Sequence, residues 1–152
     1  MHAISLQSLF SAAFLALALA GAVQAAGIES TPAQNAQVDD FTAGKNAIDA
    51  KQWDQAVASF SKVVAQNPKN ADAYNYLGYS NRWLGKYDEA FAAYGKALEL
   101  DPKHKGALQY SGIAYVKTGQ KAQAQVQLAQ LQALCASCSE TVDLAKAIAA
   151  VR

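Results

Sequence analysis

An internal repeat constrains this chain more than any other feature of its sequence. Glycine recurs at positions 44, 78 and 112, alanine at 56, 90 and 124, and proline at 68 and 102, always 34 positions apart. A bulky apolar residue keeps the same interval at Phe60, Tyr94 and Leu128. Periods of roughly 20 to 50 residues are typical of arrays in which each unit buries its apolar face against its neighbours. The period therefore predicts a stack of similar units.

The middle unit, Ala71 to Pro102, shows what one unit is. Its sequence ADAYNYLGYSNRWLGKYDEAFAAYGKALELDP places apolar residues three and four positions apart on both sides of Gly85. This spacing indicates two amphipathic helices joined by a tight turn. The second helix should end at Asp101, because a proline disfavours the helical conformation in the residue before it.

The unit resembles the tetratricopeptide repeat. The matching residues are the Leu77-Gly78 pair, Ala90, Tyr94 and the Asp101-Pro102 stop. The resemblance implies an all-α fold, a right-handed α-solenoid of three helix pairs. The pairs are expected at 37–70, 71–104 and 105–138, and they cover most of the chain.

Small and large residues at matched positions have distinct expected roles. Gly78 and Gly112 should let the first helix of a unit approach its partner closely. Phe60, Tyr94 and Leu128 should fill the space between units. Asn70 is a good candidate to cap the helix that follows it.

A last helix is expected at 139–152, running through Val151. Ser137 and Glu140 match a capping box, with Ser137 as the N-cap. Val142, Ala145 and Ile148 form one apolar stripe on this helix. We expect it to be a capping helix that covers the open end of the third repeat.

The segment 1–25 has the pattern of a secretory signal peptide. An apolar run ends in small residues, and cleavage is expected after Ala25. The segment 26–36 is polar and predicts a flexible lead-in. The alternative is an uncleaved membrane span, because the run approaches the roughly 20 residues that a span needs. A cleaved signal would place the protein in the periplasm or the secreted space.

Cys135 and Cys138 form the one reactive-looking motif, and three interpretations compete. In an oxidising compartment the pair can form a disulfide bond, which is the interpretation we favour. It could instead act as a thiol–disulfide (redox) pair, because a thiolate is stabilised at a helix start. A metal site would need three or four ligands, which two cysteines and the distant His104 do not supply.

No catalytic arrangement is evident in the sequence, and we expect neither an enzyme nor a cofactor. His104 is the only histidine after the apolar run, and no nucleophile–base pair or glycine-rich phosphate loop is recognisable. Charged residues make up 16% of the chain and the net charge is +1, which does not indicate a nucleic-acid partner. No small-molecule substrate is expected.

A surface is the best candidate site. In tetratricopeptide arrays the first helices line a concave groove that holds peptides or partner segments, so a protein or peptide partner is expected. Aromatic and arginine side chains are enriched in binding hot spots. The resemblance places in the groove Lys45, Asn75, Tyr76, Tyr79, Arg82, Trp83, Gln109, Tyr110 and Lys117.

Two further expectations concern the partner. The carboxylate clamp that some family members use on chaperone tails is matched clearly only by Lys45, since Gly106 and Tyr110 occupy two of its other places. That ligand is therefore disfavoured. Self-association through the ends of the solenoid is also open, and a membrane contact is expected only if the signal segment stays uncleaved.

Overall fold

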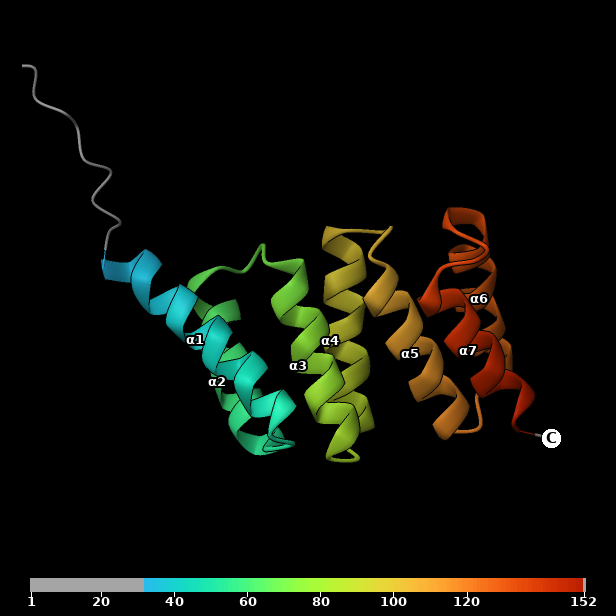
Figure 1. Ribbon diagram of the computed structural model, residues 1–152, viewed down its shortest axis with the longest axis horizontal. Helices are drawn as coiled ribbons and strands as arrows, with labels where there is room; N and C mark the ends of the chain where they lie inside the picture. The colour runs from blue at the N-terminus through green and yellow to red at the C-terminus, as the bar shows by residue number, and fades with distance from the viewer. Residues whose placement is uncertain (1–31, 152) are drawn as a thin grey trace, which may run out of the picture.

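The computed structural model describes residues 32–151, and side chains from residue 39 onward. This part of the chain forms seven α-helices and no strand (Figure 1). The predicted signal peptide at 1–25 lies outside the described residues. The helices are α1 (Pro32–Asp49), α2 (Trp53–Gln66), α3 (Ala71–Trp83), α4 (Tyr87–Leu100), α5 (Lys105–Lys117), α6 (Lys121–Leu134) and α7 (Ser139–Ala149).

The helices pack as three successive pairs followed by one single helix. Each pair, α1 with α2, α3 with α4 and α5 with α6, makes extensive contacts, and α7 packs against both α5 and α6. The predicted all-α solenoid with a capping helix is confirmed, and Figure 1 shows the pairs side by side along the long axis of the molecule.

The first helices of the pairs form the inner layer of the solenoid. α1 contacts α3, α3 contacts α5, and α5 contacts α7, whereas α2, α4 and α6 make no such contact with one another. Helices that approach more closely lie on the concave side of a curved array. The predicted groove side of the chain is therefore the layer of α1, α3, α5 and α7.

Close approach within a pair depends on glycine. A Cβ added to Gly78 would lie 2.6 Å from Cε1 of Tyr94, and one added to Gly44 would lie 2.7 Å from Cζ of Phe60. Both rings are buried. The close approach of the two helices predicted at Gly78 is confirmed, whereas Tyr94, which was expected to fill the space between units, packs against the glycine of its own repeat.

The third repeat departs from this arrangement. A Cβ at Gly112 would lie 2.5 Å from Cδ2 of Leu144, which belongs to α7. Leu144 is fully buried, whereas Leu128 is only partly buried at the edge of the same core. The buried apolar side chain against Gly112 therefore comes from Leu144 of the capping helix and not from Leu128 of α6.

Turns within the pairs share one backbone feature. Gly85 and Gly119 have φ angles of +75° and +76°, and Lys51, at the equivalent place in the first repeat, has φ +57°. Glycine adopts this left-handed conformation without steric cost, whereas a lysine does so only with strain. The turn of the first repeat is therefore the less favourable of the three.

Three predicted boundaries were wrong. The helix α1 begins at Pro32, inside the segment expected to be a flexible lead-in, since proline is favourable in the first turn of a helix. At the other end, Cys138 and not Ser137 is the N-cap of α7, and no side chain caps that helix. The same helix ends at Ala149 rather than at Val151.

Candidate interaction surface

Four aromatic rings, contributed by all three repeats, are linked by contacts through Tyr79. Trp53, at the start of α2, stacks on Trp83 at the end of α3, with ring centroids 5.2 Å apart. Tyr79 lies one helical turn before Trp83 and contacts both indoles edge-on, at 6.1 and 6.3 Å. Tyr110 of α5 packs on Tyr79 at 4.7 Å. We refer to Trp53, Tyr79, Trp83 and Tyr110 as the aromatic cluster.

Arg82 adds a positive charge to the aromatic cluster. Its guanidinium carbon lies 5.1 Å from the ring centroid of Tyr79 and 5.0 Å from that of Trp83. Both distances fit cation–π contacts. No carboxylate of the described residues forms an ion pair with Arg82, and its buried Nε has no hydrogen-bond partner there.

The cluster is partly accessible. Trp83 is 51% exposed, although a large aromatic side chain is usually well covered. Burial raises the pKa of Tyr110, so its hydroxyl stays protonated and able to donate a hydrogen bond. The cluster therefore offers a half-exposed indole, a cation and a phenol.

Three of the predicted groove residues pack within the fold and are not freely exposed on its surface. Asn75 is 5% exposed and lies beneath the start of α5, where a Cβ on Gly106 would come within 3.2 Å of its Nδ2. Gln109 is buried under α7 and donates through Nε2 to Asp143 at 3.3 Å. Tyr76 stacks on the buried Phe60 at 5.2 Å.

Lys45 and Lys117 are exposed on α1 and α5, but neither is among the residues that contact the aromatic cluster. Trp53 is the residue that sequence reasoning missed. It begins a second helix, and the expected groove used first helices alone. One signal could have identified it. Trp53 follows the tight turn between α1 and α2, and this turn lies beside the end of α3, where Trp83 stands.

The pockets described by the structure do not coincide with the predicted groove. One is lined by α2, α3 and α4, one by α4 and α6, and a shallow one surrounds the turn before α2. Trp53 borders the last of these pockets, and none of the three is lined by Tyr79, Trp83 or Tyr110. The aromatic cluster is a partly exposed surface. A surface of this kind suits a protein segment better than a small ligand.

The two cysteines are free thiols, so the predicted disulfide bond is absent from this structure. Sγ of Cys138 lies 3.0 Å from the backbone carbonyl oxygen of Cys135. Hydrogen bonds from the Cys135 side chain and from Thr141 lower the pKa of the Cys138 thiol. In residues 32–151 no group of cysteine, histidine and carboxylate side chains is arranged to hold a metal ion.

His104 is a helix cap. Its Nδ1 accepts a hydrogen bond from the backbone N–H of Ala107 at 3.2 Å, and its Nε2 lies 3.0 Å from Oδ1 of Asp72. Asn70, at the equivalent position of the preceding repeat, caps α3 in the same way through Oδ1 and the N–H of Ala73, as the sequence predicted. The histidine therefore joins the start of α5 to the start of α3.

Comparison with known proteins identifies the family. Two models described as tetratricopeptide repeat match residues 41–105 and 84–139, which together extend over most of the seven-helix region. The chain belongs to the tetratricopeptide repeat family. A search of the curated proteins found no significant match.

Several solved structures share the fold. The tetratricopeptide domain of Arabidopsis OM64 superposes with a TM-score of 0.72 at 20% identity, over 77% of this chain and 97% of that one. The TPR2B domain of yeast Sti1, solved in complex with an Hsp70 peptide, gives a TM-score of 0.70 at 20% identity, over 76% of this chain and 94% of that one. The Yersinia enterocolitica chaperone SycD, solved with a peptide of the translocator YopD, gives 0.67 at 18% identity over 76% and 88%.

These likenesses concern the fold alone, because sequence identities this low leave the binding surfaces free to differ. In the described part of the chain, no helix is long and apolar enough to span a membrane.

Proposed function

We propose that this protein is a non-catalytic module that binds a segment of a partner protein on the inner layer of its solenoid, as a scaffold or assembly factor. The observation behind the proposal is the aromatic cluster with Arg82. Aromatic and arginine side chains that meet at one exposed place are the usual components of a binding hot spot. Related tetratricopeptide domains solved with bound peptides support the same use of the fold.

The chemistry of the cluster indicates what the partner segment presents. Arg82 is a cation that lies over two rings and forms no ion pair within residues 32–151, so it suits an acceptor such as a backbone carbonyl or a carboxylate. The exposed face of Trp83 suits an apolar or aromatic side chain beside that acceptor. Gly106 and Tyr110 stand where a carboxylate clamp would need basic or amide groups, so the contact differs from that clamp.

The location belongs to the proposal as well. An apolar run with a small-residue end at 1–25 supports export to the periplasm or the secreted space by a cleaved signal peptide. Fractionation of cells followed by N-terminal sequencing tests this directly. Mature protein that begins at Ala26 is the expected result, and an intact N-terminus in the membrane fraction would establish the uncleaved alternative.

The binding proposal is tested by affinity capture from the native compartment with chemical crosslinking. Wild-type protein is compared with the double variant Arg82→Ala, Trp83→Ala and with the control Val126→Ala, which alters an exposed residue on α6. The expected result is a partner captured by wild type and control and lost with the double variant. Equal capture by all three proteins would refute the assignment of the surface.

A further inference from the structure

The junction between the first and second repeats lacks the aromatic pair that fills the junction between the second and third. In the second and third repeats, Phe91 of α4 stacks on Tyr115 of α5, with ring centroids 4.5 Å apart and planes at 22°. The residues 34 positions earlier are Val57 of α2 and Asn81 of α3. Two rings therefore fill the junction between the second and third repeats, whereas a valine and an asparagine stand at the junction between the first and second.

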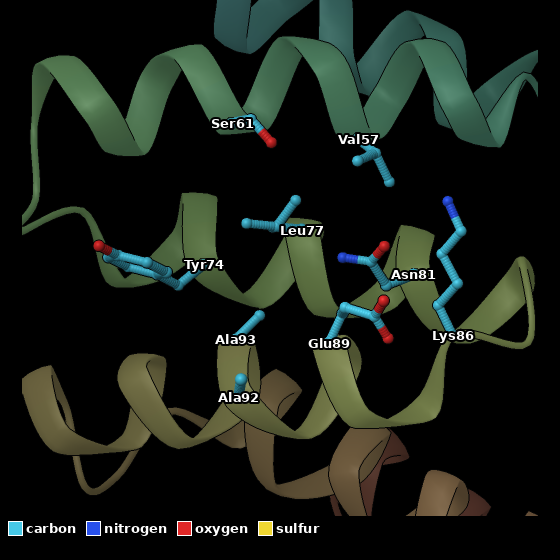
Figure 2. Close-up of a pocket in the computed structure, with 9 residues that line it drawn as sticks. All are labelled: Val57, Ser61, Tyr74, Leu77, Asn81, Lys86, Glu89, Ala92 and Ala93. Atoms are coloured by element: carbon cyan, nitrogen blue, oxygen red, sulfur yellow. The ribbon is translucent and has the colours of Figure 1, made fainter.

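A pocket occupies the place that the rings leave open. Its volume is about 520 Å³, within the range of small-ligand sites. Figure 2 shows it between α2 and α4, with residues of α3 behind. It is lined by Val57, Ser61, Tyr74, Leu77, Asn81, Lys86, Glu89, Ala92 and Ala93.

The side chain of Asn81 is the unusual member of this lining. It is 6% exposed and no side-chain hydrogen bond is found for it within residues 32–151, but its amide atoms are not among the fully buried polar atoms that lack a partner. Figure 2 shows this side chain on α3 among the other residues that line the pocket. The Asn81 amide lines the pocket and is available to a ligand that can both donate and accept a hydrogen bond.

We propose that this pocket binds a tyrosine side chain of a partner protein. The ring would lie against Val57, Leu77 and Ala93, in the place that the third repeat fills with its own aromatic pair. The phenol hydroxyl both donates and accepts, which matches the carbonyl and NH₂ of the Asn81 amide. Phenylalanine or leucine would leave that amide unpaired and would bind less tightly.

This site is distinct from the aromatic cluster. Tyr74, Leu77 and Asn81 are three and four residues apart and lie on one side of α3. Tyr79 and Trp83, also four apart, lie on the opposite side of the helix. The inference therefore does not depend on the proposed function, and a partner could contact α3 from both sides.

The test is a titration of ¹⁵N-labelled protein with N-acetyl-tyrosinamide, N-acetyl-phenylalaninamide and N-acetyl-leucinamide, followed by NMR. The expected result is saturable shifts at the amides of Leu77, Asn81 and Ala93 for the tyrosine probe, with a dissociation constant on the order of 1 mM. The other two probes should bind at least about threefold more weakly, which is the discrimination expected for one hydrogen bond. Shifts confined to Tyr79 and Trp83, or equal affinity for all three probes, would overturn the proposal.

Two variants sharpen the test. The double variant Val57→Phe, Asn81→Tyr copies the pair of the next repeat, and it should fill the pocket and abolish the shifts. Asn81→Leu keeps the space and removes the amide, so it should bind the tyrosine and phenylalanine probes equally. Unchanged preference for tyrosine in Asn81→Leu would contradict the role of Asn81.

Discussion

The indole rings of Trp53 and Trp83 stack with their planes only 6° from parallel, and this stack joins the first repeat to the second. Trp53 opens α2 and Trp83 closes α3, so the pair lies where two helix ends meet. About half of the Trp83 side chain remains exposed. An ordered but open indole costs little entropy when a partner covers it, and this makes the pair suitable for recognition.

Replacement of Trp83 by alanine should separate binding from stability. Because the side chain is half exposed, Trp83→Ala should lower the free energy of unfolding by only about 1 kcal/mol. Partner affinity should fall at least about tenfold, as for other hot-spot residues. Phe60→Ala is the contrast, since it empties a fully buried site and should cost about 3–5 kcal/mol. Urea unfolding and a binding titration measure both quantities. Parallel losses of stability and affinity in Trp83→Ala would mean that the residue is structural.

Gly78→Ala should destabilise the protein by about 1–3 kcal/mol or more, because the new Cβ would overlap the buried ring of Tyr94. Gly95→Ala is the matched control within α4, where a Cβ meets nothing within 4 Å. That change should stabilise the protein by up to about 1 kcal/mol through a better helix propensity. Thermal unfolding of the two variants compares them directly, and equal effects would refute the close packing at Gly78.

His104→Ala should cost about 1 kcal/mol, because the N–H of Ala107 loses its cap. His104→Asn should keep most of that stability, since Asn70 caps α3 from the equivalent position with a 2.9 Å hydrogen bond. Chemical denaturation provides the measurement. If asparagine is as damaging as alanine, the contact with Asp72 and not the cap is the important one.

Cys138 should react with iodoacetamide at a lower pH than Cys135. Its thiol pKa is lowered by hydrogen bonds, so the reactive thiolate is populated at pH values where an ordinary thiol is still protonated. Mass spectrometry after timed alkylation at a series of pH values, roughly pH 6 to 9, gives the rate of alkylation of each cysteine as a function of pH. This range includes the ordinary pKa of a cysteine thiol. Thr141→Val should move the Cys138 profile upward toward the ordinary one. Identical profiles for both cysteines would leave no ground for the thiol–disulfide interpretation of this pair.

Much of the fold follows from the repeat period, which identifies the helix pairs and the glycine at which two helices approach closely, Gly78. The period did not indicate that Tyr94 would pack on this glycine within one repeat. The same period misled at Gly112, where the fit comes from Leu144 on a helix outside the repeats. A repeat pattern describes contacts between like units, so it cannot predict how a unique capping helix packs.

The candidate surface was predicted only in part. Tyr79, Arg82, Trp83 and Tyr110 do come together, because they share one side of neighbouring first helices. Asn75 and Gln109 were expected to be open and are buried, since their exposure depends on how closely α5 and α7 approach. Trp53 joins from a second helix, and helix periodicity carries no information on contacts made across a turn.

The central claim is that a partner binds at the aromatic cluster, and tryptophan fluorescence tests it most directly. The chain has two tryptophans, and both stand in the cluster, so the emission reports on this surface alone. Titration with a tryptophan-free segment of the captured partner should give a saturable change in emission, with an affinity that falls at least about tenfold in Arg82→Gln. Binding that calorimetry detects, with emission unchanged and Arg82→Gln indistinguishable from wild type, would contradict the account.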